Sequence, residues 1–149
     1  MKLLLKTPIQ NDLKTTFSLF NEDLFRALKP PLISLNVARF DGCKTGDEVH
    51  LEIGLGPVKQ KWVSLITDDK EHDEVCFFID EGKLLPPPLK YWKHIHRLVK
   101  VDNNNCMIED DITFSSGNKF LDLLLYPIMY SQFAMRSPVY KKLLNRTNS

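Results

Sequence analysis

His94, His96 and Asp110 are the residues whose types and spacing could do chemistry in this sequence. The two histidines lie two positions apart in residues 91–101, which have the composition of a β-strand, and a polar turn at 102–104 leads into a second strand-like run at 105–115. A three-residue turn is a common hairpin length, and here it places His96 opposite Asp110. Because side chains alternate along a strand, both lie on one largely apolar side of the sheet. The spacing therefore predicts a half-buried His–Asp pair in contact.

The predicted pair has two interpretations. A nearby carboxylate favours the charged imidazole whereas burial opposes it, and such a balance suits an acid–base pair or a ligand contact inside a cavity. A cross-strand pair can equally be structural, because it satisfies two polar groups and fixes the register of the hairpin. The residues leave both interpretations open.

The same two histidines are also candidate metal ligands. His94 and His96 point to one side of their strand, with roughly 7 Å between their Cα atoms. A usable site needs a third or fourth ligand. The sequence has no partner motif such as His-Glu-x-x-His. We therefore expect neither a metal nor a cofactor.

Two arginines lie in mostly apolar surroundings, Arg39 at the end of a strand-like run and Arg136 within a helical pattern. A guanidinium in such a place must find a partner. Acidic residues that could form a salt bridge are plentiful: Asp41, Asp80, Glu81 and Asp110. The alternative is that an arginine anchors a ligand carboxylate, which its planar fork binds in bidentate fashion.

The elements that must position these residues follow from periodicity and turn signals. A short strand at 2–6 precedes two short helices, 12–20 with Asn11 or Asp12 as its cap and 22–28 capped by Asn21. Alternating apolar residues then predict further antiparallel strands, at 33–38, 49–55, 58–67, 72–80, 91–101 and 105–115, with a break beginning at Glu81-Gly82.

The last part of the chain shows apolar residues at helical spacing, from Phe120 to Leu143. Pro127 and Pro138 interrupt this pattern and predict kinks or short breaks. A long helix with a wide apolar face must be covered, and the concave face of a curved sheet is the available cover. Strands joined by hairpins, with helices at the ends, predict an α+β fold.

Composition limits the class of protein. The chain has 149 residues, 43% of them hydrophobic, and a net charge of +1, which suits a single domain over 1–149 and excludes a generally basic nucleic-acid binder. We expect no nucleic-acid partner. No apolar run is long enough to span a bilayer. Three widely spaced cysteines indicate a reducing compartment, so we expect a cytoplasmic protein.

Four segments, taken in order, resemble the SRPBCC superfamily of birch-pollen-allergen-like proteins, lipid-transfer (START-like) domains and polyketide cyclases. They are Val37-Ala38-Arg39-Phe40-Asp41-Gly42, Trp92-Lys93-His94-Ile95-His96-Arg97, Ile108-Glu109-Asp110-Asp111-Ile112-Thr113-Phe114 and Phe133-Ala134-Met135-Arg136. The resemblance implies a helix-grip fold: about six or seven curved strands around a long kinked C-terminal helix. It also implies an apolar cavity between sheet and helix. Similar domains are found fused to some sugar-nucleotide-epimerase-like proteins, which implies a possible epimerase-like partner.

The resemblance and the apolar, aromatic sheet face together predict binding or carriage of a small hydrophobic or amphipathic molecule. The alternatives are a cyclase, dehydratase or hydrolase that uses His96 and Asp110, or an accessory role; we expect a monomer or weak homodimer. The candidate ligand-contacting residues are Arg39, Trp62, Phe78, Trp92, His94, His96, Asp110, Ile112, Phe114, Leu124, Tyr126, Ile128 and Met135. Aromatic residues on sheet faces also form plain core, so the apolar members have that second interpretation.

Overall fold

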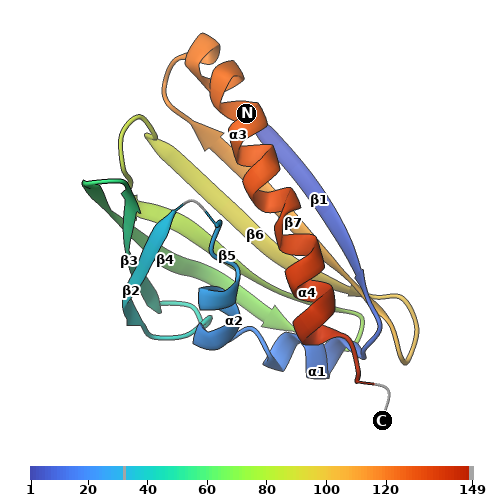
Figure 1. Ribbon diagram of the computed structural model, residues 1–149. Coiled ribbons are helices and arrows are strands. Elements are labelled where there is room, and N and C mark those ends of the chain that lie inside the picture. Colours follow the sequence, from blue (N-terminus) through green and yellow to red (C-terminus); the bar gives the residue numbers. More distant parts are fainter. Residues whose placement is uncertain (32, 148–149) are drawn as a thin grey trace.

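A computed structural model describes residues 1–31 and 33–147 and shows one antiparallel sheet of seven strands, with helices on one of its faces (Figure 1). The elements in chain order are β1 (Lys2–Ile9), α1 (Leu13–Ser18), α2 (Glu22–Ala27), β2 (Ser34–Phe40), β3 (Glu48–Leu55), β4 (Val58–Glu71), β5 (Val75–Leu84), β6 (Tyr91–Lys100), β7 (Cys106–Ser115), α3 (Lys119–Ala134) and α4 (Arg136–Leu144). This is the predicted α+β arrangement.

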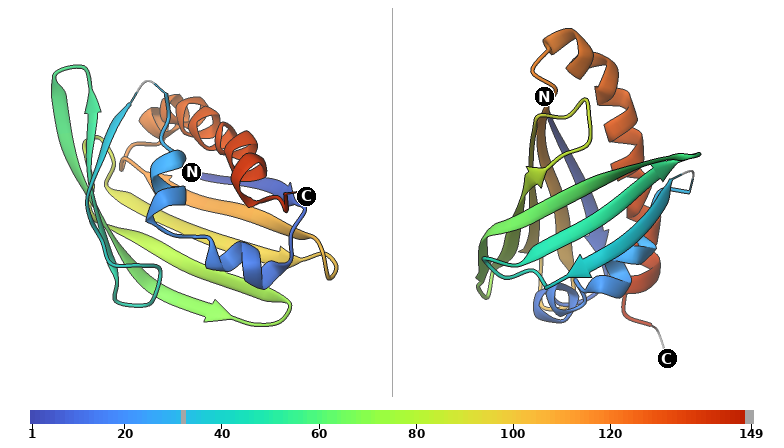
Figure 2. Two further views of the ribbon diagram at one scale, coloured as in Figure 1. Left: turned by 60° about the horizontal axis from the view of Figure 1, so that its bottom comes forward. Right: turned by 90° about the vertical axis from the view of Figure 1, so that its left-hand side faces the viewer.

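The sheet is strongly curved, as predicted, and its strands lie in the order β1-β7-β6-β5-β4-β3-β2. The register shifts once between β2 and β3, and twice between β4 and β5. Such irregularities bend and twist a strand. Figure 2 shows the result: the sheet wraps around the helices, and α3 and α4 lie along its concave side.

The short helices begin where the sequence predicts. Asp12 caps α1 by accepting a hydrogen bond from the Thr15 amide, and Asn21 caps α2 in the same way through Leu24. Each side chain satisfies an amide that has no partner within the first turn of its helix. These caps fix the two helices between β1 and β2, where α2 reaches the cavity described below.

The long C-terminal helix consists of two segments that meet at Met135. The predicted interruption at Pro138 is therefore present, and it falls just before the proline because the ring crowds the carbonyl four residues earlier, which is that of Ala134, the last residue of α3. Pro127 lies inside α3, which continues through it as one helical run. No helix in the described ranges is long and apolar enough to cross a membrane.

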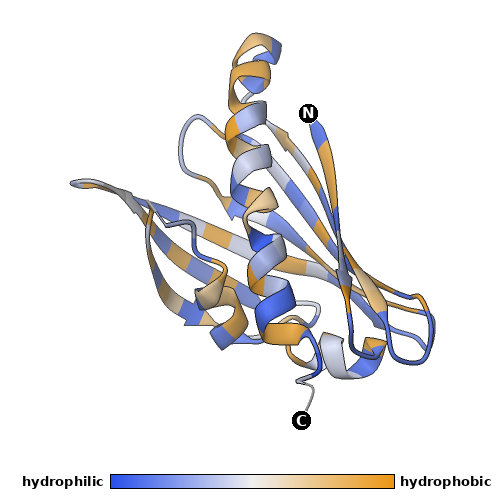
Figure 3. Cartoon of the chain, turned by 45° about the vertical axis from the view of Figure 1, so that its right-hand side comes forward, coloured by the Kyte–Doolittle hydropathy of each residue, from blue (hydrophilic) through white to orange (hydrophobic). Residues whose placement is uncertain are grey.

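The face that α3 turns towards the sheet differs from the expected one. Leu124, Ile128 and Met135 are 54%, 52% and 47% exposed, so their predicted place in the cavity is wrong. The sheet is instead contacted by Leu125, Met129 and Phe133. Figure 3 shows why the pattern misleads: apolar residues follow the outer side of α3 as well, and its first turns extend past the end of the sheet. A periodic pattern that is apolar on several faces does not select one of them.

The hairpin of β6 and β7 has the predicted register, with His96 opposite Asp110 and Leu98 opposite Ile108. Buried and less buried residues alternate along β6, and along β7 except at Asp111, which is buried between Asp110 and Ile112. His94, His96 and Asp110 all lie on the concave, helix-covered side, where they are almost fully buried.

Candidate functional site: a buried Asp–His–His cluster at a cavity wall

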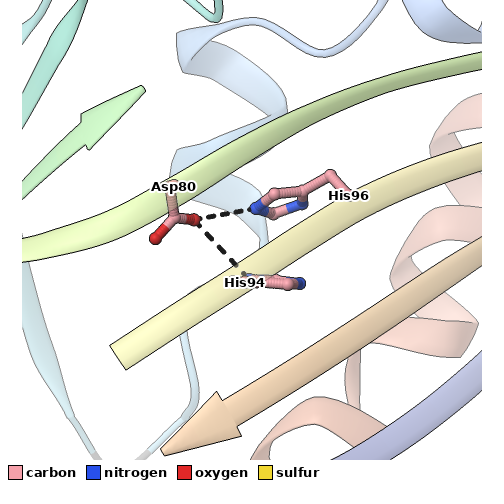
Figure 4. Close-up of side chains that lie close together, drawn as sticks. All are labelled: Asp80, His94 and His96. Carbon is pink, nitrogen blue, oxygen red and sulfur yellow. Dashed lines mark hydrogen bonds and ion pairs between the residues drawn. The ribbon is translucent and has the colours of Figure 1, made fainter. Parts of the chain in front are cut away.

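Three side chains from two neighbouring strands meet at the centre of the concave face: Asp80 from β5, and His94 and His96 from β6 (Figure 4). Asp80 lies opposite His94 in the register of β5 and β6. The imidazole rings of the two histidines are stacked against each other at a tilt, with 3.6 Å between their centroids. Their nitrogens face Asp80 Oδ2, which lies 3.7 Å from Nδ1 of His94 and 3.0 Å from Nε2 of His96.

The hydrogen bonds connect different partners from those predicted. His96 is hydrogen-bonded through Nε2 to Asp80, and its Nδ1 lies 3.8 Å from Asp110 Oδ1, too far for a hydrogen bond. Asp110 is instead bonded to His94, with 2.8 Å between Oδ1 and Nε2. Phe78 stacks on the His96 ring at a centroid distance of 4.2 Å, and this contact holds the ring in its orientation towards Asp80.

Asp80 is held by two further donors. Trp92 Nε1 donates to its Oδ1 at 2.9 Å, and Ser64 Oγ donates to the same oxygen at 3.2 Å. Trp62 Nε1 in turn donates to the Ser64 hydroxyl. The carboxylate therefore has one oxygen fixed by neutral donors and the other directed to the imidazoles.

Burial and charge set the protonation of the cluster. The pKa of His96 is lowered to about 4, because burial disfavours the charged ring and positive charge on His94 adds to that. Burial would raise the pKa of Asp80, but the hydrogen bond from His96 and the histidine charges outweigh it, and the pKa is lowered. Asp110 behaves in the same way, since its bond to His94 and the charge of Arg136 outweigh burial and lower its pKa. The network thus favours two carboxylates and a neutral His96.

Arg136, in the first turn of α4, completes the surroundings of the cluster. Its guanidinium carbon lies 4.1 Å from the centre of the Phe133 ring. Its Nη1 is buried and has no hydrogen-bond partner among the residues that the structure describes. Tyr140, one turn further along α4, is fully buried with its hydroxyl 3.4 Å from Asp110, and burial raises its pKa. The helix break at Met135 thus precedes two polar side chains that reach the sheet.

A cavity of about 140 Å³ adjoins this cluster. Four of the predicted residues line it: Trp62, Trp92, His94 and His96. The rest of the wall comes from α2, the chain that follows it, β2–β5 and α3–α4: Phe25, Leu28, Lys29, Pro30, Ile33, Leu35, Leu51, Ile53, Ser64, Asp80, Met129, Gln132, Phe133 and Arg136. Phe78 lines a second, smaller cavity of about 40 Å³, and His96 borders both. Apolar side chains dominate both walls.

The other predicted site residues lie elsewhere. Arg39 is a surface residue paired with Asp41, because the register shift between Val37 and Arg39 turns it away from the covered face on which Val37 packs. Its predicted ligand contact is therefore wrong, and its salt-bridge interpretation holds. Ile112 and Phe114 are fully buried in a core cluster against which Tyr126 packs. Asp110 reaches the cavity only through its bond to His94.

Sequence reasoning missed Asp80 as a site residue, because the predicted strand ended there. In the structure β5 continues past Glu81-Gly82 to Leu84, so the predicted break is wrong. Gly82 pairs with Ser64 next to one of the register shifts between β4 and β5. The long connection between β5 and β6 sets no register by itself, so nothing in that segment signals that Asp80 faces His94. Met129, Gln132 and Phe133 were missed through the choice of helix face.

Neither a protein-family model nor a curated protein sequence matches the chain. Norcoclaurine synthase from Thalictrum flavum, solved with dopamine and hydroxybenzaldehyde, has a TM-score of 0.69 at 14% identity, over 100% of this chain and 88% of that one. Ara h 8.0201 has a TM-score of 0.60 at 10% identity, over 94% of this chain and 97% of that one. The chain has the helix-grip fold.

A third helix-grip structure is the di-domain ARO/CYC protein BexL from the BE-7585A biosynthetic pathway, with a TM-score of 0.62 at 10% identity. The matched region covers 92% of this chain and 45% of BexL. The predicted resemblance to the SRPBCC superfamily is confirmed at the level of the fold. At these identities the comparison shows architecture, and a helix-grip fold serves several functions. The function must be argued from the cavity.

Proposed function

We propose that the protein binds a small, mainly apolar molecule, about the size of one aromatic ring with an oxygen substituent, in the larger cavity. The observation that carries this proposal is an apolar cavity that adjoins a buried cluster of charged and polar side chains. Ligand sites combine such apolar walls with a few placed polar groups.

The volume limits the size of the ligand. A cavity of roughly 150 Å³ lined by apolar side chains takes up benzene. The cavity of about 140 Å³ is of that order, which favours one ring over a lipid chain. The broader prediction of lipid carriage is therefore narrowed here to a compact ligand. Trp62 and Trp92, which meet edge to face at 4.9 Å between centroids, would contact such a ring.

The polar end of the ligand follows from Arg136. This residue lines the cavity, and its buried Nη1 lacks a partner within the described chain. A buried donor without an acceptor costs about 1–3 kcal/mol, and more when it is charged. A ligand oxygen, and a carboxylate above all, would remove that cost.

Intrinsic fluorescence tests the proposal directly, because the chain has two tryptophans and both line the cavity. We would titrate EDTA-treated protein with benzene, benzoate and benzylamine. Saturable quenching is expected, with benzoate bound more tightly than benzene because of Arg136. Arg136→Gln should weaken benzoate by about ten- to a hundredfold, the loss of one charged hydrogen bond, and leave benzene nearly unchanged. Arg39→Gln is the matched control. If none of the three compounds binds saturably, the proposal is refuted.

An enzyme is the second candidate function, and the hydrogen bond between Asp80 and His96 at the cavity wall favours it. A positioned His–Asp pair can move a proton to or from a bound molecule. The pair differs from the predicted one, since Asp80 takes the place of Asp110. The test is turnover of a one-ring carbonyl compound. If His96→Gln abolishes this turnover but still binds the compound, the enzyme function is established.

Three further predictions extend this proposal. A cytoplasmic location, the epimerase-like partner and the monomeric or weakly dimeric state rest on cysteine usage and on the resemblance. Light scattering across a concentration series, and recovery of an epimerase-like protein with the tagged chain from its own host, would test the last two.

A further inference from the structure

We propose that Asp80, His94 and His96 bind one divalent transition-metal ion, with zinc as its simplest representative. The ligand atoms of the three residues lie within 4.8 Å of one another. Two ligands of a tetrahedral zinc, each about 2.0–2.1 Å from the ion, are roughly 3.3 Å apart. The separations of 3.7 and 3.0 Å between Asp80 Oδ2 and the two imidazole nitrogens bracket that value.

The donor set suits a metal that accepts nitrogen and oxygen. Two imidazoles and one carboxylate with open positions are a set used for zinc and for non-haem iron. All three residues line the larger cavity, so an open coordination position would face that space. The sequence provided no third ligand beside the two histidines. The structure provides one, Asp80, on β5, the strand next to that of the histidines.

The groups around the three residues are those that orient metal ligands. His94 is bonded through Nε2 to Asp110, which leaves Nδ1 for the ion, and a carboxylate on the far nitrogen is the usual support of a metal-binding histidine. Asp80 accepts the hydrogen bonds of Trp92 and Ser64 on Oδ1, so that Oδ2, which is bonded to His96, is the oxygen directed towards the ion site. His94 and Asp80 are thus each fixed by hydrogen bonds that do not compete for the ion, and the ring of His96 is held by stacking on Phe78.

His96 gives an independent argument. Its Nε2 is bonded to Asp80, and its buried Nδ1 has no partner among the described residues although Asp110 Oδ1 lies 3.8 Å away. A neutral ring that donates from Nε2 directs a lone pair from Nδ1 towards that carboxylate. With an ion on Nε2, the single ring proton lies on Nδ1 and faces the carboxylate favourably. Metal binding therefore turns the repulsive lone-pair contact with Asp110 into an attractive one without changing the charge of the ring.

Charge also favours a cation. Asp80 and Asp110 place two carboxylates in the buried cluster, and Arg136 supplies one fixed positive charge near them. Buried charges are stable when they are paired or coordinate a metal. The inference does not rest on the organic ligand of the proposed function, because its test uses the metal alone.

The test is a titration of EDTA-treated, desalted protein with Zn²⁺ by calorimetry, together with ring ¹⁵N NMR. The chain has four histidines, at positions 50, 72, 94 and 96, so every ring can be assigned. We expect one ion per chain and large nitrogen shifts confined to His94 Nδ1 and His96 Nε2. Shifts confined to His50 or His72, or no binding at micromolar Zn²⁺, would overturn the proposal. These measurements need no variant.

Variants then assign the ligands. Asp80→Asn should weaken Zn²⁺ binding more than a hundredfold, and Asp110→Asn, which only orients His94, by about ten- to a hundredfold. His50→Gln is the control, because His50 forms a comparable pair with Glu48 outside the cluster. Co²⁺ should give visible absorption typical of nitrogen and oxygen ligands. A thiolate charge-transfer band would assign the ion to a cysteine and contradict the proposal, as would unchanged affinity in folded Asp80→Asn.

Discussion

His94 is hydrogen-bonded to Asp110 diagonally across β6 and β7, although the two residues are not opposite each other in the sheet. The residue opposite Asp110 is His96, which is bonded to Asp80 on the other neighbouring strand. The two histidines of one strand are thereby attached to carboxylates on both sides. One polar network links the neighbouring strands β5, β6 and β7, and the following predictions test its parts.

Removal of the charge at Asp110 should destabilise the fold. Asp110 is 2% exposed, and its Oδ1 accepts from His94 while the Tyr140 hydroxyl lies at 3.4 Å. We expect Asp110→Asn to lower the free energy of unfolding by about 1–3 kcal/mol in urea denaturation. The control is Asp73→Asn, since Asp73 is exposed and pairs with the exposed Lys14, a contact worth less than about 1 kcal/mol. Equal losses in the two variants would contradict a buried network at Asp110.

Stability should fall with acid because of His96. The pKa of this residue is lowered in the folded state, from 6.5 to about 4, so the unfolded chain binds more protons between those values. Its contribution is therefore complete above pH 6.5 and is lost as the pH falls towards 4, by on the order of 3 kcal/mol in total. Asp80, Asp110, His94 and Arg136 surround the ring, and the lowered pKa values of the two carboxylates act only at still lower pH.

This pH dependence is measured as the urea midpoint of EDTA-treated protein from pH 7.5 to 4. His96→Gln should flatten the curve between pH 6.5 and 4, and His50→Gln should leave it unchanged. A wild-type curve that is already flat over this interval would show that His96 is not buried in its neutral form.

Replacement of Arg39 should have almost no effect on thermal stability or on ligand affinity. Its guanidinium donates to both oxygens of Asp41 on the exposed side of β2 and does not line the cavity. Pairs of this kind are screened by water and salt. We expect Arg39→Ala to keep the thermal midpoint and the benzoate affinity of the wild type. A clear loss of benzoate binding would restore Arg39 as a ligand contact.

The cysteines should resist alkylation while the protein is folded. Cys43 lines the smaller cavity, and burial raises its pKa to about 12. Because the thiolate is the reactive form, iodoacetamide at pH 8 should modify Cys43 slower than a free thiol by on the order of a thousandfold. Intact mass spectrometry of native and urea-unfolded protein measures this ratio. Rapid labelling of native Cys43, located by peptide mapping, would show an exposed thiol.

The sequence predicted the features that depend on neighbouring residues. The turn at 102–104 set the β6–β7 register, and the caps at Asp12 and Asn21 set the short helices. Two features could not be obtained in this way. Asp80 faces His94 through a pairing that no short turn defines, and the orientation of α3 depends on which of several apolar faces the sheet covers. Both are decided by tertiary packing, which periodicity does not encode.

The break at Met135 separates two helices that are anchored very differently. In α4, Tyr140 and Leu144 are buried in the core, whereas α3 buries only Asp122 and Phe133 among its described residues. Local opening costs least where few apolar contacts are lost. Backbone amides of α3 should therefore exchange with deuterium before those of α4. Because Met129, Gln132 and Phe133 belong to the cavity wall, such excursions of α3 would give small molecules a route to the interior while α4 and the sheet stay closed.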